Sequence, residues 1–199
     1  VVYQLGKAAS GMDWNPDSQF DIDRRNDSGY LPVFTNTYKA PDPTKDVRDD
    51  VATPTVSWNG KAVQVGDTLT YVIGWNNTAI DETGAAAPGS VRVSDTVPAG
   101  TVYVEGSAAS DHEGTDIQVS EDGTLTWTIS NAAAGDAGFV SFKVRVTEEA
   151  LGRTDEDGNP VVTNTDASVS INDNPGVTVQ PGTSNPVERG ALSITKELD

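Results

Sequence analysis

Short segments in which every second residue is apolar dominate this chain and limit what it can fold into. Turn sequences rich in glycine, proline, asparagine and aspartate separate them. Many short strands at this spacing predict an all-β, immunoglobulin-like antiparallel sandwich rather than a parallel α/β sheet. One segment, "VTEEALGR", has a helical pattern of one or two turns. The alternating segments are 69–75, 91–95, 102–104, 125–129, 140–146, 167–171 and 192–194.

Charge and composition exclude several classes of function. The chain has 199 residues, no cysteine, and 13 Lys+Arg against 30 Asp+Glu, which gives a formal charge of −17. Disulfides, thiol catalysis and cysteine metal sites are therefore excluded, and nucleic acid or an anionic membrane would repel such a chain. No apolar run approaches the roughly 20 residues that a transmembrane helix needs. We expect no cofactor, and we expect any signal peptide or sorting tail to lie outside this chain.

Two short signatures alternate along the chain. "VFTNT" (33–37) precedes "PTKDV" (43–47), and "VVTNT" (161–165) precedes "ITKEL" (194–198). Proline-containing junctions at 38–46 and 180–190 accompany them. We predict a complete unit at 41–188, the tail of a preceding β domain at 1–40, and the first strand of a following domain at 189–199. The alternative is that both outer pieces pack on the central sandwich.

The order of these motifs, from "PTKDV" through "VRVSDTVPAG" and "GFVSFKVRVTE" to "VVTNTDASVSI", resembles the isopeptide-forming domains of Gram-positive surface proteins. The similar families are the collagen-adhesin A-like fimbrial domains and the C-terminal domains of antigen I/II adhesins. The resemblance covers about 41–188, and the outer pieces resemble collagen-adhesin B-type or pilin domains. It implies a lysine on the first strand bonded to an asparagine on a late strand, promoted by an acid. The matching residues are Lys45, Asn164 and Asp95, separated by 95 − 45 = 50 and 164 − 45 = 119 positions.

The residues support this assignment independently. Asp95 has the strand parity of Val91 and Val93, so it should point into the core. Burial favours the protonated carboxyl and the neutral amine, which are the two species that the reaction needs. The amine attacks the Asn164 carbonyl, the carboxyl donates to the oxygen that becomes negative, and ammonia leaves. Alternatively, Asp95 only starts the turn "DTVPAG".

Two features fit the assignment less well. Asn164 has the parity of Val162, whereas Ala167 and the residues after it carry the apolar face. Both faces can point inward only if a β-bulge lies near 165–166. Lys61, in "WNGKAV", is an alternative lysine, but the Asn-Gly pair predicts an exposed turn, so we prefer Lys45. Lys143 alternates away from the apolar face and should be solvated.

The outer pieces carry half-sites of neighbouring domains. Asn36 of "FTNTY" would pair with a lysine of a preceding domain, and Lys196 with an asparagine of a following one. We expect His112 in a surface loop rather than in a hydrolase site. In "DIDRRNDSG" (21–29), Arg25 stands where a calcium loop needs Asp or Asn, and the acidic "TDEDGNP" (154–160) is typical of a hairpin turn.

Together these observations predict a structural stalk or spacer module of an adhesin or pilus-like protein, on the extracellular, cell-wall-anchored surface of a Gram-positive bacterium. It would not be an enzyme beyond a single self-reaction, and its partners would be neighbouring domains of the same protein. The alternative is an adhesin module that recognises a host glycan or protein through the loops 81–90 and 107–115. A third is an accessory domain of a secreted enzyme. Trp75 and Trp127 follow the core parity, so only Trp58 is a candidate for an exposed sugar platform.

Overall fold

A computed structural model describes residues 39–50, 55–81 and 83–189, which all belong to one compact unit, 35–199. Thirteen strands and one short 3-10 helix, η2 (Glu148–Gly152), make up this part of the chain. The helix lies where the sequence predicts it. The strands are β1 (Thr44–Asp49), β2 (Val63–Gln64), β3 (Thr68–Asn76), β4 (Gly89–Thr96), β5 (Thr101–Tyr103), β6 (Ala109–Ser110), β7 (Asp116–Val119), β8 (Thr124–Ala132), β9 (Ala137–Val146), β10 (Val161–Asn164), β11 (Ser168–Ile171), β12 (Val177–Thr178) and β13 (Thr183–Glu188).

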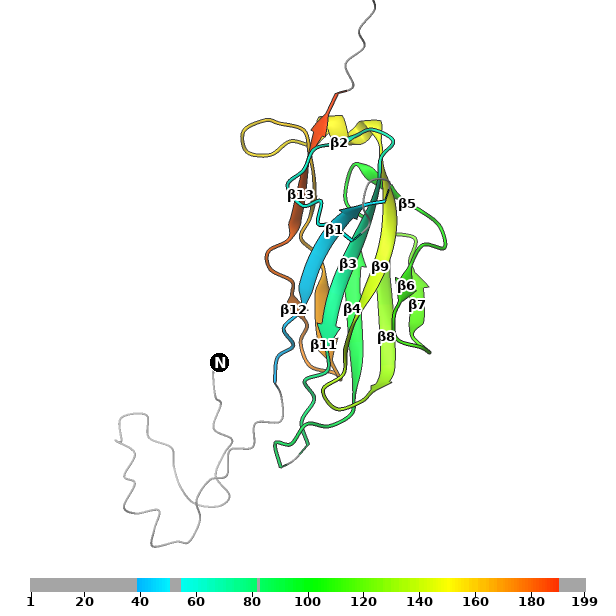
Figure 1. Ribbon diagram of the computed structural model, residues 1–199, viewed down its shortest axis with the longest axis vertical. Coiled ribbons are helices and arrows are strands. Elements are labelled where there is room, and N and C mark those ends of the chain that lie inside the picture. Colours follow the sequence, from blue (N-terminus) through cyan, green and yellow to red (C-terminus); the bar gives the residue numbers. More distant parts are fainter. Residues whose placement is uncertain (1–38, 51–54, 82, 190–199) are drawn as a thin grey trace, which may run out of the picture. The chain divides into compact units, whose positions relative to one another are not determined.

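The strands form two five-stranded sheets and one three-stranded sheet (Figure 1). One large sheet has the order β1-β3-β9-β5, with β6 also paired to β9, and the other has the order β12-β11-β4-β8-β7. The small sheet has the order β10-β13-β2. All pairs are antiparallel except the two-residue contact between β13 and β2. The predicted all-β sandwich is confirmed, with this small third sheet as an addition.

The core comes from the alternating faces of the long central strands. β3 alternates half-buried and buried residues along its whole length, and β8 and β9 do so over most of theirs. Phe142 lies at the centre, with ring centroids 5.3 Å from Tyr71 and 6.0 Å from Trp127. Trp75 and Trp127 are buried, as their parity predicts. The period-2 pattern therefore identified the inward faces of these strands correctly.

The pattern failed at β5. Val102, expected on an apolar face, is 51% exposed, whereas Tyr103 packs against the core. The register explains this, because Val102 lies opposite Arg145 and Tyr103 opposite the buried Val144. Residues opposite each other in adjacent strands point to the same side of the sheet. The longer strand β9 thus decides which residue of the short edge strand turns inward.

The expected bulge near 165–166 takes a different form. β10 belongs to the small sheet and β11 to a large one, so the chain changes sheets between Asn164 and Ser168. Thr165 and Asp166 are exposed in this connection, and Asn164 and Ala167 on either side of it are both buried. Two strands of different sheets, rather than one bulged strand, allow both faces to point inward.

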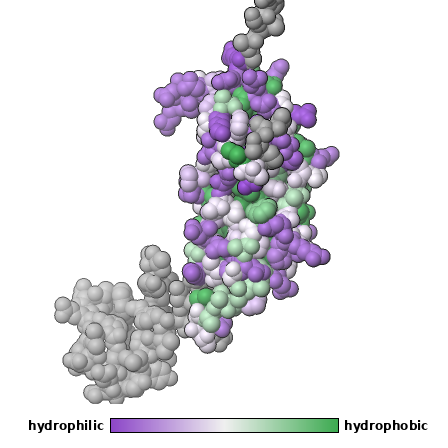
Figure 2. Space-filling view, viewed as in Figure 1, coloured by the Kyte–Doolittle hydropathy of each residue, from purple (hydrophilic) through white to green (hydrophobic). Residues whose placement is uncertain are grey.

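Hydrophilic residues predominate on the face of the sandwich shown in Figure 2, as the charge of −17 leads us to expect. No helix among the described residues is long and apolar enough to cross a membrane. The first described strand is β1 and the last is β13, whose final residues lie at the top of the sandwich in Figure 1. The outer domain assignments, 1–40 and 189–199, fall almost wholly outside the described residues and stay predictions.

Candidate cross-link site

Lys45 lies near the start of β1 and points into the sandwich. It shares the parity of Val47, which is fully buried, and it pairs with Ile73 of β3. Its side chain has no exposed surface. A lysine in such a place is unusual, because a buried ammonium is costly unless it is paired or loses its proton.

Asp95 lies in β4, on the opposite sheet, and is 1% exposed. The inward orientation that its parity predicts is confirmed. The pairing of β4 with β11 ends at Ser94, opposite Ser168, so β11 is no longer paired with β4 where the Asp95 side chain points into the core. The Thr96 N–H donates to Asp95 Oδ1 at 2.8 Å, which leaves Oδ2 for other partners.

A single carboxyl oxygen contacts the other two residues. Lys45 Nζ donates to Asp95 Oδ2 at 2.8 Å, and Asn164 Nδ2 donates to the same oxygen at 3.2 Å. Asn164, at the end of β10, is 3% exposed. The three residues are far apart in sequence and belong to three different sheets, yet they meet in one buried cluster.

The amide of Asn164 has a defined orientation. The Asp166 backbone N–H donates to Asn164 Oδ1 at a long 3.5 Å, and a backbone N–H can only face an acceptor. The amide nitrogen therefore faces Asp95. This differs from the sequence-based expectation, in which the Asp95 carboxyl donates to the amide oxygen. The contact that the structure contains places the carboxyl between the amine and the amide nitrogen instead.

Burial shifts both titrating groups towards their neutral forms. Desolvation lowers the pKa of Lys45, and the attraction of Asp95 opposes this only in part. Desolvation likewise raises the pKa of Asp95, against the opposing effect of the Lys45 charge and hydrogen bond. Both directions favour a neutral amine beside a protonated carboxyl, because a low-dielectric core penalises each charge.

The other two candidate lysines lie elsewhere. Lys61 is exposed, with its Nζ 4.4 Å from the centroid of the half-buried Trp58 ring. The Lys143 side chain is 39% exposed, and its Nζ pairs with Asp50 Oδ1 at 2.7 Å. Both positions agree with the expectation for these lysines. The half-sites Asn36 and Lys196 lie outside the described residues.

Sequence reasoning missed two residues beside the cluster. The Tyr71 ring lies 5.4 Å from Lys45 Nζ, and Thr183 of β13 is the direct cross-strand partner of Asn164. The alternation places Tyr71 in the core without showing its neighbours. Thr183 lies within the proline-containing junction 180–190, in which no period is visible, so only the pairing of β13 with β10 shows its position.

The remaining motifs that fall among the described residues contain no second reactive cluster. His112 lies in the loop between β6 and β7, as expected, and its Nδ1 faces the carbonyl oxygen of Glu113. The 154–160 segment is a hairpin turn closed by a Thr154–Pro160 bridge. Within the described ranges no group of three or more acidic, histidine or cysteine side chains is placed to hold a metal. The 21–29 segment lies outside the described residues.

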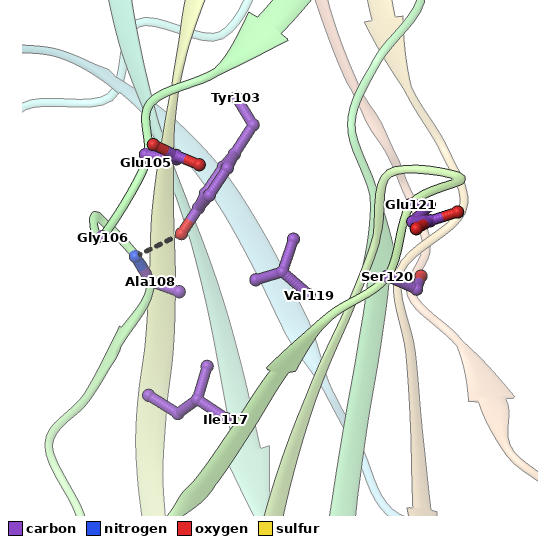
Figure 3. Close-up of a pocket in the computed structure, with 8 residues that line it drawn as sticks. All are labelled: Tyr103, Glu105, Gly106, Ala108, Ile117, Val119, Ser120 and Glu121. Carbon is purple, nitrogen blue, oxygen red and sulfur yellow. Dashed lines mark hydrogen bonds between the residues drawn. The ribbon is translucent and has the colours of Figure 1, made fainter.

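An open groove of about 780 Å³ lies beside β7 (Figure 3). Its walls come from the β5–β6 segment on one side and from β7 and the following turn on the other. The Tyr103 hydroxyl accepts a hydrogen bond from the Ala108 N–H at 3.1 Å, which fixes the ring in the wall. The lining residues are Tyr103, Glu105, Gly106, Ala108, Ile117, Val119, Ser120 and Glu121.

No family model and no curated protein sequence matches this chain. Solved structures do match. The C-terminal domain of the antigen I/II polypeptide BspA from Streptococcus agalactiae is 16% identical with a TM-score of 0.52, and the match covers 73% of this chain and 50% of that one. The corresponding domain of Streptococcus pyogenes AspA is 16% identical with a TM-score of 0.50, covering 74% and 46%.

A Corynebacterium diphtheriae protein described as membrane anchored is 11% identical with a TM-score of 0.51, covering 79% of this chain and 38% of its own. This chain thus spans half or less of the length of these solved structures. At such low identity the likeness concerns the fold. The sandwich that carries Lys45, Asp95 and Asn164 has the fold of the antigen I/II C-terminal domains.

Proposed function

We propose that residues 41–188 are a structural stalk module of a Gram-positive cell-surface adhesin or pilus-like protein, closed by a covalent bond between Lys45 Nζ and Asn164 Cγ. One observation carries the proposal. A single buried oxygen, Asp95 Oδ2, contacts both the nitrogen that would attack, at 2.8 Å, and the nitrogen that would leave, at 3.2 Å.

The reaction has the net effect of moving one proton from Lys45 Nζ to Asn164 Nδ2 through the Asp95 carboxyl. The neutral Lys45 amine attacks Asn164 Cγ, a new N–C bond forms, and the carbonyl electrons move to Oδ1. Nζ then gives up a proton through Asp95 Oδ2, and Nδ2 receives one from the same carboxyl. The Cγ–Nδ2 bond breaks and ammonia departs, which leaves an amide between the two side chains. The carboxyl ends as it began, so it acts as a general acid and base for one turnover.

The core favours the product over the unreacted groups. Before the reaction it holds an amine and a carboxyl whose charged forms are both penalised by burial. Afterwards it holds a neutral amide and one acid, so the cost of burying an ammonium is gone. Closing a loop of 164 − 45 = 119 residues removes unfolded-state entropy worth about 5 kcal/mol, if the disulfide relation applies.

The surface location is proposed on the same basis. The similar solved structures include antigen I/II C-terminal domains and a membrane-anchored protein, and the excess of acidic residues suits an exposed surface module. We propose cell-wall anchoring through segments outside this chain, with neighbouring domains of the same protein as partners. The half-sites Asn36 and Lys196 would belong to those neighbours.

The alternative, a ligand-binding adhesin module, has one candidate surface among the described residues. The lining of the open groove beside β7 includes Glu105, Gly106 and Ala108, and Ala108 also belongs to the loop 107–115 named from the sequence. Its lining combines exposed Ile117 and Val119 with two glutamates. Its aromatic residue, Tyr103, is half-buried and packs against the core, so the groove offers less ring surface for stacking a sugar than the alternative requires.

Intact-mass measurement of the folded chain tests the proposal. The wild-type protein should be lighter than its sequence mass by one ammonia, and Lys45→Met and Asp95→Asn should keep the full mass. Lys61→Met and Lys143→Met are matched controls, and both should lose one ammonia. A full sequence mass in the folded wild type would refute the cross-link, and an unchanged loss in Lys45→Met would refute the residue assignment.

A further inference from the structure

Two hydroxyl groups beside the cross-link cluster are buried without a hydrogen bond of normal geometry in the described part of the chain. Tyr71 is 0% exposed and Thr183 is 2% exposed, and neither hydroxyl oxygen has a partner of normal geometry. A buried hydroxyl that gives up water without gaining another partner destabilises the fold. Such groups call for a reason, and catalysis is one of the recognised reasons.

Both hydroxyls belong to residues that border the reacting atoms. Thr183 lies directly opposite Asn164 in the β10–β13 pair, so their side chains are on the same side of the sheet. The Tyr71 ring packs 5.4 Å from Lys45 Nζ. Burial, and then the Asp95 charge, raise the pKa of Tyr71, and the nearby Thr183 hydroxyl, by donating towards the phenol oxygen, opposes this only in part. Tyr71 therefore keeps its proton and remains a donor.

The oxygen of Asn164 is weakly hydrogen-bonded in the unreacted state. Asp95 contacts the amide nitrogen rather than Oδ1. Among the described residues, Oδ1 accepts one long hydrogen bond, from the Asp166 backbone N–H at 3.5 Å. Attack by Lys45 turns this oxygen into an oxyanion in a buried site. An oxyanion there needs donors that are already in place, because their orientation then costs nothing during the reaction.

We propose that the hydroxyls of Tyr71 and Thr183 donate hydrogen bonds to Asn164 Oδ1 as it becomes negative in the tetrahedral intermediate. The inference rests on the proposed Lys45–Asn164 cross-link and adds the groups that stabilise its transition state. Donors that lack a well-formed hydrogen bond before the reaction and gain one only during it lower the barrier, because they bind the transition state better than the ground state. No atom is gained or lost, since both hydroxyls keep their protons.

The experiment compares rates of ammonia loss among near-isosteric variants. Cell-free synthesis of the full chain is followed by quenching in denaturant at timed intervals, and intact mass gives the cross-linked fraction. Tyr71→Phe and Thr183→Val should each slow bond formation by about tenfold or more, as removal of an oxyanion donor does elsewhere. Thr183→Ser keeps the hydroxyl and should restore most of the rate.

Two controls match these changes. Thr163→Val alters an exposed threonine next to Asn164, and Tyr103→Phe alters a tyrosine whose hydroxyl is bonded elsewhere. Both should react at the wild-type rate. The unfolding free energies of Tyr71→Phe and Thr183→Val, measured in a Lys45→Met background that cannot react, should be unchanged or higher, because each substitution removes an unpaired buried hydroxyl.

Wild-type rates in both variants would overturn the inference. So would a slow reaction accompanied by a matching loss of stability in the Lys45→Met background, because that result assigns the hydroxyls to the fold rather than to the reaction. A wild-type chain that folds but never loses ammonia would refute the cross-link itself. That outcome is distinct, because it appears before any variant is made.

Discussion

Pulling on the two ends of the chain should reveal which part of the sandwich the cross-link protects. With Lys45 bonded to Asn164, force travels from β1 through the side chains to the end of β10. Residues 46–163 then cannot extend. Residues 165–188 follow the bond in the load path, and β11, β12 and β13 can still detach from their partners. The module should therefore be only partly inextensible.

The expected lengths follow from the positions of the strands. The releasable segment has 188 − 164 = 24 residues, which extend to about 80 Å at roughly 3.4 Å per residue. A Lys45→Met chain can extend from the start of β1 to the end of β13, or 188 − 44 = 144 residues, about 490 Å. The two proteins should differ by about 400 Å, several times the length released in the wild type.

Single-molecule force spectroscopy measures these lengths directly, with the same handles on wild type and Lys45→Met. The wild-type sample is first shown by mass to have lost one ammonia. A wild-type extension near that of Lys45→Met would refute the covalent clamp between β1 and β10. A cross-linked chain that breaks its handles without any step near 80 Å would show instead that β11–β13 do not detach.

Two further predictions concern the titrating pair and a buried amide. Cross-linking should have a bell-shaped pH dependence, because the reactive pair shares one proton between Asp95 and Lys45. At low pH both groups are protonated and the amine cannot attack, and at high pH the carboxyl has lost the proton that it must donate. Burial raises the pKa of Asp95 from 3.8 and lowers that of Lys45 from 10.5. The rise and the fall of the reaction rate should therefore both lie between pH 3.8 and pH 10.5. Intact mass after refolding unreacted chain at a series of pH values measures the profile, and a rate that rises steadily to pH 10 would contradict it. Asn185→Ala should lower the free energy of unfolding by about 2 kcal/mol, because the buried Asn185 Nδ2 donates to the Trp58 and Lys61 carbonyls at 2.7 and 3.0 Å. Urea unfolding checks this against Asn59→Ala, an exposed residue with one bond to the Ser184 N–H, which should cost less.

Local alternation was enough to predict the long strands and the inward face of Asp95. In β4 the parity of Val91, Val93 and Asp95 is that of one continuous strand, and all three are buried. Side-chain direction in a strand depends on position along the chain, so sequence carries it. The same holds for Trp75 and Trp127. The resemblance to known families then supplied the partners Lys45 and Asn164, which no local pattern connects.

The local pattern failed to predict side-chain direction where the chain passes from one sheet to another or forms a short edge strand. The short strand β5 takes its orientation from β9, so Val102 is exposed although the sequence alternates there. The offset between Asn164 and Ala167 arises because β10 and β11 belong to different sheets. Neither fact is encoded near the residues concerned, because both depend on pairing with strands distant in sequence.

The sequence by itself determined the fold class, the acidic surface and the inward direction of Asp95, because these depend on composition and on a period of two residues. Tertiary structure alone decided the chemistry of the candidate site. It placed one oxygen of Asp95 against both Lys45 Nζ and Asn164 Nδ2, and it left the hydroxyls of Tyr71 and Thr183 beside them without a hydrogen bond of normal geometry. Contacts of this kind join strands of three sheets, and their geometry depends on how those sheets pack, which a single strand cannot specify.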